Sequence, residues 1–207
     1  MARKGQAAVL TLDELGQLWQ ELAQPHQAIA KLCYYTASRI SEVVRLEVGD
    51  IRSKVIHVRM SKRKDDGVKT IAIAPALQAA LGEYGLPESG FLFPAAHWAR
   101  ATRKQYRIDR GKRNGKNHFD LVAELPPSGH ISTAAVNRAI VNAAAVLGLE
   151  GVSSHSFRRS MATHLYREGV PLRTIMGITG HESLASLTRY LALEEKAAFD
   201  VLSNLSW

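Results

Sequence analysis

Apolar residues recur at helical spacing along much of the chain. Leu15, Leu18 and Leu22 lie three or four positions apart, and Thr11 followed by Glu14 matches the capping box that opens a helix. The stretch around Cys33 is apolar enough to place that residue in the core of a second helix. Similar patterns predict the helices over about 27–36, 41–46, 75–84, 132–147 and 156–168, one from Pro171, one from Ser183 through Tyr190, and one over 193–205.

After Asp50 the apolar spacing changes from helical to strand-like. Residues 55–60 predict one strand and residues 71–73 a second, with the polar KRKDDG sequence as the turn between them. Residues 94–130 are basic and interrupted by Gly and Pro, which favours a loop or insertion. The predicted fold class is mainly α with a small antiparallel β-sheet (α+β), in a single domain over 1–207.

Composition excludes several classes of protein. No apolar run reaches the ~20 residues that span a bilayer, and the N-terminus lacks the apolar stretch of a signal peptide. A single cysteine rules out an intramolecular disulfide and a Cys-rich zinc site. We therefore expect a cytoplasmic, nucleoid-associated protein with no membrane partner.

The charge balance indicates a polyanionic partner. Lys and Arg number 27 against 19 Asp and Glu, which gives a net charge of +8. One block between His97 and His118 contains a single acid, Asp109, and is either a phosphate-binding segment or a solvated basic loop. Its candidate DNA-binding residues are Arg100, Arg103, Lys104, Arg107, Arg110, Lys112, Arg113 and Lys116.

Four segments carry residue types suited to phosphate chemistry. They are TASRISEVVRL with Arg39, RMSKRKDDGVKTIAI with Lys62, SSHSFRRSMATHL with His155 and Arg158, and ITGHESLASLTRYLAL with His181 nine residues before Tyr190. Each motif alone is weak, because H-x-x-R occurs by chance in many proteins. All of them in this order form a specific signal.

These segments resemble the Arg…Lys…His-x-x-Arg…His…Tyr set of tyrosine recombinases, the phage-integrase family, over nearly all of the chain. The resemblance implies that family's catalytic-domain fold, double-stranded DNA as partner, and no metal or other cofactor. Arg159 departs from the family pattern, which usually has a His after the second Arg. Most members also carry an N-terminal DNA-clamp domain, whereas eight residues precede Val9 here. We therefore expect a naturally minimal or a truncated recombinase without that domain.

The resemblance assigns Arg39 and Arg158 to a phosphate clamp, with His181 as a third donor. Phosphodiester cleavage places extra negative charge on the non-bridging oxygens, and preorganised cationic donors lower that barrier. A guanidinium suits this task because its planar fork can hold two phosphate oxygens. Glu42 is expected to buttress Arg39 or the helix start.

Tyr190 is the implied nucleophile, and the product would be a 3′-phosphotyrosyl link with a free 5′-hydroxyl. A free phenol has a pKa near 10, so about 0.1% is ionised at pH 7 and a base is needed. The family offers His155 as that base. Lys62 is the best general-acid candidate for the leaving oxygen, although Lys64 and Lys69 occupy the same predicted hairpin.

Three functions fit this residue set. The first is a recombinase that integrates, excises or inverts DNA without metal or ATP, since the only acids between Val152 and Leu193 are Glu168 and Glu182. The others are a type IB topoisomerase and a catalytically silent DNA-binding regulator of the same fold. For the recombinase we expect self-association on DNA as a tetrameric synapse through the C-terminal tail helix 193–207, with a free protein that can be monomeric.

Overall fold

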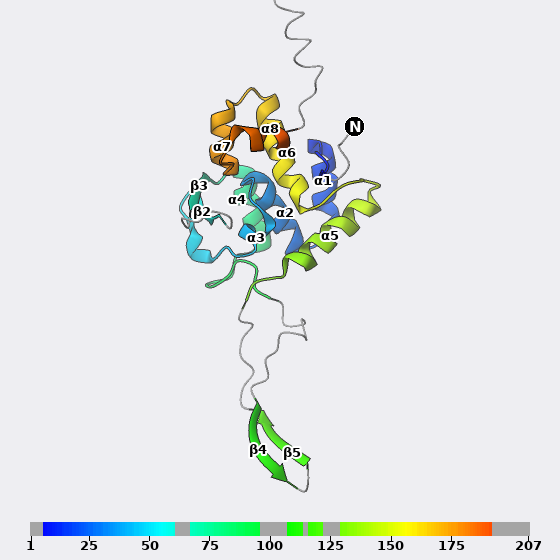
Figure 1. Ribbon diagram of the computed structural model, residues 1–207, viewed down its shortest axis with the longest axis vertical. Helices are drawn as coiled ribbons and strands as arrows, with labels where there is room; N and C mark the ends of the chain where they lie inside the picture. Colours follow the sequence, from blue (N-terminus) through cyan, green and yellow to red (C-terminus); the bar gives the residue numbers. More distant parts are fainter. Residues whose placement is uncertain (1–5, 61–66, 96–106, 114–115, 122–128, 192–207) are drawn as a thin grey trace, which may run out of the picture.

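The first helix begins where the sequence predicts it. The computed structural model describes residues 6–60, 67–95, 107–113, 116–121 and 129–191 (Figure 1). Helix α1 spans Leu12–Glu21, and the hydroxyl of Thr11 accepts the backbone N–H of Glu14 at 3.2 Å. The Glu14 carboxylate accepts the Thr11 N–H in return at 2.7 Å, which completes the predicted capping box.

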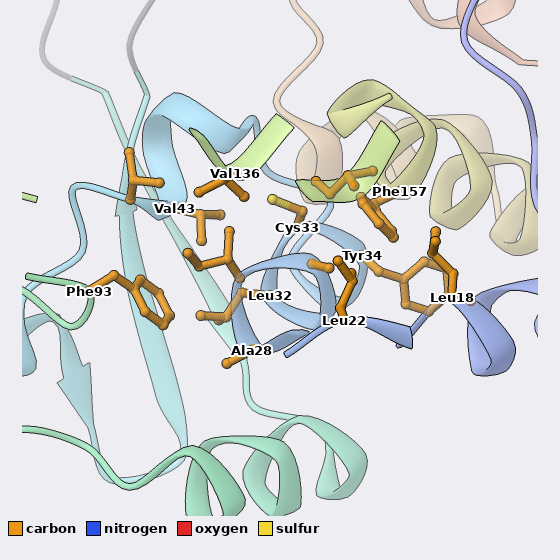
Figure 2. Packing of buried hydrophobic residues seen from close by; sticks show 14 of the residues in the cluster. Leu18, Leu22, Ala28, Leu32, Cys33, Tyr34, Val43, Phe93, Val136 and Phe157 are labelled. Carbon is orange, nitrogen blue, oxygen red and sulfur yellow. The ribbon is translucent and has the colours of Figure 1, made fainter. Parts of the chain in front are cut away.

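Helix α2, His26–Tyr35, lies at the centre of the domain (Figure 1). It contacts α1, α3, α4, α5 and α6, and a helix surrounded in this way must be apolar on most of its circumference. Ala28, Leu32, Cys33 and Tyr34 are accordingly buried in the main core (Figure 2). The prediction that Cys33 is a core residue is confirmed.

A short α3, Ile40–Val43, and a 3₁₀ turn, Val48–Asp50, lead into a three-stranded antiparallel sheet. Its strands are β1 (Ile51–Arg52), β2 (Val55–Arg59) and β3 (Val68–Ala72), in the order β1-β2-β3. Ile56 pairs with Ile71 and Val58 with Lys69, so these four side chains share one face. The helix-rich architecture with one small sheet confirms the predicted fold class.

Three further helices pack against α2. Helix α4 spans Pro75–Tyr84 as predicted, α5 spans Thr133–Val146 after the cap Ser132, and α6 spans Ser154–Arg167 after the cap Ser153. The start of α6 lies two residues before the predicted position. None of the described helices is long and apolar enough to cross a bilayer.

The C-terminal helices form a second, smaller core. Helix α7 spans Leu172–Thr179 and α8 spans Leu184–Tyr190, with Pro171 as the residue before α7 and not in its first turn. Ala162 of α6, Ile175 of α7 and Leu187 of α8 are buried together. This packing fixes α8 against the two helices before it. The predicted tail helix 193–205 lies outside the described residues.

The expectation of an irregular loop over 94–130 is wrong in part. Strands β4 (Arg107–Arg113) and β5 (Lys116–Leu121) pair as an antiparallel hairpin, with a register shift between Asp109 and Lys112. The overlooked signal is Asn114–Gly115, since Asn-Gly is the strongest two-residue hairpin signal. Of the predicted DNA-binding residues, Arg100, Arg103 and Lys104 lie outside the described residues.

Gly180 ends α7 in the left-handed conformation, with φ of 68°. A Cβ at this position would lie 2.6 Å from the sulfur of Met60, so the left-handed backbone favours glycine and the flexible Met60 side chain would have to shift for a larger residue. The backbone N–H groups of Gly180 and His181 both donate to the Met176 carbonyl, which closes the turn before His181.

We predict opposite effects of adding a methyl group at two glycines of this segment. Gly180→Ala should lower the free energy of unfolding by roughly 1–3 kcal/mol, because of backbone strain and the clash with Met60. Gly177→Ala, inside α7 with open space around it, should raise that free energy by about 0.5–1 kcal/mol. Denaturant titration of both variants measures the difference, and a Gly180→Ala protein as stable as the wild type would contradict the prediction.

Candidate active site

Arg39 occupies the position just before α3, and Glu42 holds it there. The guanidinium Nη1 donates to the Glu42 carboxylate at 2.8 Å, and the Arg39 backbone N–H donates to the other carboxylate oxygen at 2.9 Å. The Glu42 side chain is fully buried, whereas Arg39 remains 23% exposed. The predicted buttressing role of Glu42 is confirmed at both the side chain and the helix start.

The side chain of Arg158, on α6, reaches the segment that precedes Arg39. It is 2% exposed, and its Nη1 donates to the Ala37 carbonyl at 2.7 Å. Its Nη2 lies 3.5 Å from Nε2 of His181. The structure therefore brings Arg39 together with Arg158 and His181, which lie more than 100 residues later in the sequence.

Arg159, the neighbour of Arg158, points to a different part of the protein. Its guanidinium donates to the Ala7 carbonyl and, at 2.9 Å, to the side-chain oxygen of Gln6. Arg159 therefore fixes the segment before α1 and does not join the Arg39 cluster. This arrangement agrees with the choice of Arg158 from its spacing to His155.

His181 follows Gly180, and Thr179 orients its ring. The Thr179 hydroxyl donates to the Ile175 carbonyl at 2.7 Å, so its oxygen can accept a hydrogen from Nδ1 of His181, which lies 2.7 Å away. A neutral ring that carries its hydrogen on Nδ1 has an acceptor at Nε2. In this state Nε2 accepts from Arg158 and cannot donate to a phosphate.

The charges around this cluster are strongly positive. Burial, followed by the charges of Arg158, Arg39 and Lys69, lowers the pKa of His181 to about 4, so the ring is neutral at pH 7. Burial alone would raise the pKa of Glu42, but the hydrogen bonds from Arg39 and the charges of Arg39 and Lys69 outweigh it and lower that pKa. The cluster is thus cationic at neutral pH, with one carboxylate behind it.

An open pocket adjoins these groups. It lies at the end of β2 and the start of α8, and Arg39 and His181 are part of its lining. Its lining residues are Arg39, Met60, Gly180, His181, Glu182, Ser183 and Ser186.

The structure describes the other predicted site residues only in part. His155 is exposed in the first turn of α6, one turn before Arg158, and its backbone N–H donates to the Ser153 hydroxyl at 3.3 Å. Tyr190 is the last residue of α8, but its side chain is not among the described parts. Lys62 and Lys64 lie outside the described residues.

Sequence reasoning missed two contributors, Lys69 and Thr179. Lys69 was only an alternative to Lys62, yet its ammonium is buried beside Arg39 and Arg158. Its pairing with Val58 places Lys69 on the inner face of the sheet, but this register is seen only in the structure, since the predicted second strand covered 71–73. Thr179 had no sequence signal, since its role depends on the turn at Gly180.

Two other histidines, His164 and His57, make contacts outside this cluster. Nδ1 of His164 lies 2.9 Å from the Tyr34 hydroxyl, and their rings meet edge to face. Nδ1 of His57 lies 2.9 Å from the Thr70 hydroxyl on the paired strand.

Comparison with known proteins identifies the family. The model of the phage integrase family matches residues 8–197. The chain belongs to the phage integrase family. Among curated relatives, a putative integrase/recombinase y4qK of Sinorhizobium fredii is 30% identical over 170 residues, which cover 81% of this chain and 46% of the relative. The tyrosine recombinase XerC of Bifidobacterium longum is 27% identical over 169 residues, which cover 81% of this chain and 43% of the relative.

Solved structures of this family share the fold. XerA recombinase aligns with a TM-score of 0.68 at 21% identity, over 99% of this chain and 68% of XerA. A post-cleavage complex of XerH site-specific recombinase with a difH substrate aligns with a TM-score of 0.65 at 16% identity, over 98% of this chain and 54% of XerH. The chain spans about half the length of the curated relatives that it matches.

The lowered pKa of His181 predicts a pH dependence of stability. The unfolded ring has a pKa near 6.5 and the folded ring about 4, so the unfolded state binds more protons between these values. Stability should therefore fall as the pH drops from about 6.5 to 4. His181→Gln should show a shallower fall than the wild type in urea titrations over this range. Parallel curves for the two proteins would contradict the assignment.

Proposed function

We propose that this protein is a site-specific DNA recombinase that cleaves and rejoins double-stranded DNA through a 3′-phosphotyrosyl intermediate, without metal or ATP. The proposal includes self-association on DNA, as a tetrameric synapse, and a cytoplasmic, nucleoid-associated location. Membership of the phage integrase family supports this function.

The observation that carries the proposal is the cation cluster around the Ala37 carbonyl. Arg39 and Arg158 are held by fixed partners, so little reorganisation is needed when negative charge develops on a bound phosphate. Guanidinium groups stay protonated at every working pH, which suits them to this task. Within the described residues, no group of three or more His, Cys, Asp or Glu side chains is placed to hold a metal ion.

In the proposed reaction, the phenolic oxygen of Tyr190 attacks the phosphorus while the bond from phosphorus to the 5′-oxygen breaks. His155 accepts the phenolic proton, and Lys62 donates a proton to the leaving 5′-oxygen. One phosphoester bond replaces another, so rejoining reverses these steps and requires no energy source. The position of Tyr190 at the end of α8, which packs on α6 and α7, is consistent with attack near Arg158 and His181.

We predict that Tyr190→Phe abolishes covalent attachment to DNA and leaves affinity for DNA nearly unchanged, because only the hydroxyl is lost. Tyr190→Phe protein would first select a binding site from a random duplex library. A nicked suicide duplex with that site would then be incubated with each protein in excess EDTA, and covalent complexes separated by denaturing electrophoresis. Tyr166→Phe is the matched control and should form the adduct like the wild type.

The adduct assay, together with a plasmid relaxation assay, separates the alternative functions. A wild type that binds the selected site without forming an adduct would be a silent regulator. Relaxation of supercoiled plasmid without pairing of sites would indicate the topoisomerase. An adduct that persists in Tyr190→Phe would show that another residue is the nucleophile.

The basic hairpin β4–β5 gives a prediction on DNA affinity. Each phosphate contact contributes roughly −0.9 to the slope of log affinity against log salt concentration. Neutralising Arg107, Arg110, Lys112 and Arg113 together should make this slope measurably shallower in fluorescence-anisotropy titrations. An unchanged slope would mean that these residues remain solvated when DNA binds.

A further inference from the structure

Lys69 occupies a position where a strand of this kind usually carries an apolar residue. On β3 the apolar Val68 is 52% exposed, whereas Lys69 is 7% exposed. Its cross-strand partner Val58 is fully buried, so both side chains lie on the inner face of the sheet. A buried ammonium is costly unless its hydrogens have acceptors, so the contacts of this lysine indicate its role.

The ammonium of Lys69 joins two segments of the candidate active site. Its Nζ donates to the Thr36 carbonyl at 2.9 Å and to the Ala37 carbonyl at 3.4 Å, both just before Arg39. It also donates to the Ile178 carbonyl at 3.2 Å, three residues before His181. An ammonium has three N–H groups, and three carbonyl oxygens surround it here.

Charged and titratable groups face Lys69 from every side. Arg39 and Glu42 come from the α3 segment, Cys33 from α2 and Arg158 from α6. Burial is the largest influence and, with the charge of Arg158, lowers the pKa of Lys69 to about 7. The charge of Lys69 in turn contributes to the low pKa of His181.

We propose that Lys69 is a positioning residue for DNA cleavage. Its ammonium joins the segment before Arg39 to the end of α7 before His181, and so sets the spacing between the side chains of Arg39 and His181. This inference rests on the proposed function. Lys69 does not act as the general acid, because its three N–H groups are directed at backbone carbonyls of the protein. That role stays with Lys62 in the proposed mechanism.

The first test needs no activity. The imidazole of His181 would be titrated by NMR in DNA-free wild type, Lys69→Met, Lys69→Arg and Lys54→Met, with His181→Gln used to assign its signals. Lys69→Met should raise the pKa of His181, whereas Lys69→Arg keeps the charge and should leave that pKa low. Lys54 is exposed on the same sheet, so Lys54→Met should titrate like the wild type. Identical titrations in all four proteins would overturn the proposal.

The second test measures cleavage of the nicked suicide duplex. At saturating DNA, Lys69→Met should form the adduct roughly tenfold or more slowly, with an affinity for DNA close to that of the wild type. Lys69→Arg should recover most of the rate. Wild-type rates in Lys69→Met would overturn the proposal.

A modified substrate separates positioning from proton donation. In a duplex with sulfur in place of the bridging 5′-oxygen, the leaving thiolate requires no general acid, because a thiol has a pKa near 8.5. The slow cleavage by Lys69→Met should persist on this substrate. If the sulfur substrate restores the rate, Lys69 is the general acid and the proposal is wrong.

The pH dependence of Lys69→Arg covers the case in which Lys69→Met does not fold. Above pH 7 wild-type Lys69 loses a proton and one N–H, whereas Arg stays charged. At subsaturating DNA, where the rate reports groups of the DNA-free protein, the ratio of the Lys69→Arg rate to the wild-type rate should therefore rise between pH 7 and 9, and a constant ratio would count against the proposal. If the wild type forms no adduct, the proposed function fails, and the NMR titration alone decides whether Lys69 couples to His181.

Discussion

Two buried carbonyl groups where α2 ends govern the arrangement of the site. Thr36 and Ala37 are fully buried, and a buried carbonyl without a donor costs roughly 1–3 kcal/mol. Lys69 of β3 donates to both oxygens and Arg158 of α6 donates to that of Ala37, while the Ser38 hydroxyl also donates to the Thr36 carbonyl. Satisfying these carbonyls therefore brings two cations close to the segment that leads into Arg39. The hydrogen bonds that close the fold also assemble the cation cluster.

The like charges gathered at this site destabilise the DNA-free protein. Arg39, Lys69 and Arg158 repel one another in a buried setting, and within the described cluster Glu42 is the carboxylate that offsets them. Burial is the largest cause of the lowered pKa values of Lys69 and His181, and this repulsion lowers both further. A bound phosphate would reduce the repulsion among these cations. Relief of that repulsion therefore contributes to the free energy of anion binding. Stability and anion affinity are therefore opposed at this site.

Sequence patterns predicted the helices well because caps and apolar periods are local. The Thr11 box, the start of α4 at Pro75 and the burial of Cys33 follow from a few neighbouring residues. The β4–β5 hairpin was missed because its strands are basic and lack apolar alternation. Lys69 was undervalued for a different reason. Its role depends on which distant carbonyls need a donor, and hydrophobic periodicity contains no information on that.

The state of His181 illustrates how much of the site depends on such non-local contacts. The motif assigns it as a phosphate donor, but Thr179 holds its Nδ1 and Arg158 faces its Nε2. With a pKa of about 4 the ring has no hydrogen to offer from Nε2 at neutral pH. An anion placed between Arg39, Arg158 and His181 raises that pKa, because it offsets the positive charges that lowered it. Donation from Nε2 to a phosphate thus requires proton uptake on DNA binding, and the Thr179 contact keeps the ring oriented in both protonation states, since Nδ1 carries its hydrogen in each.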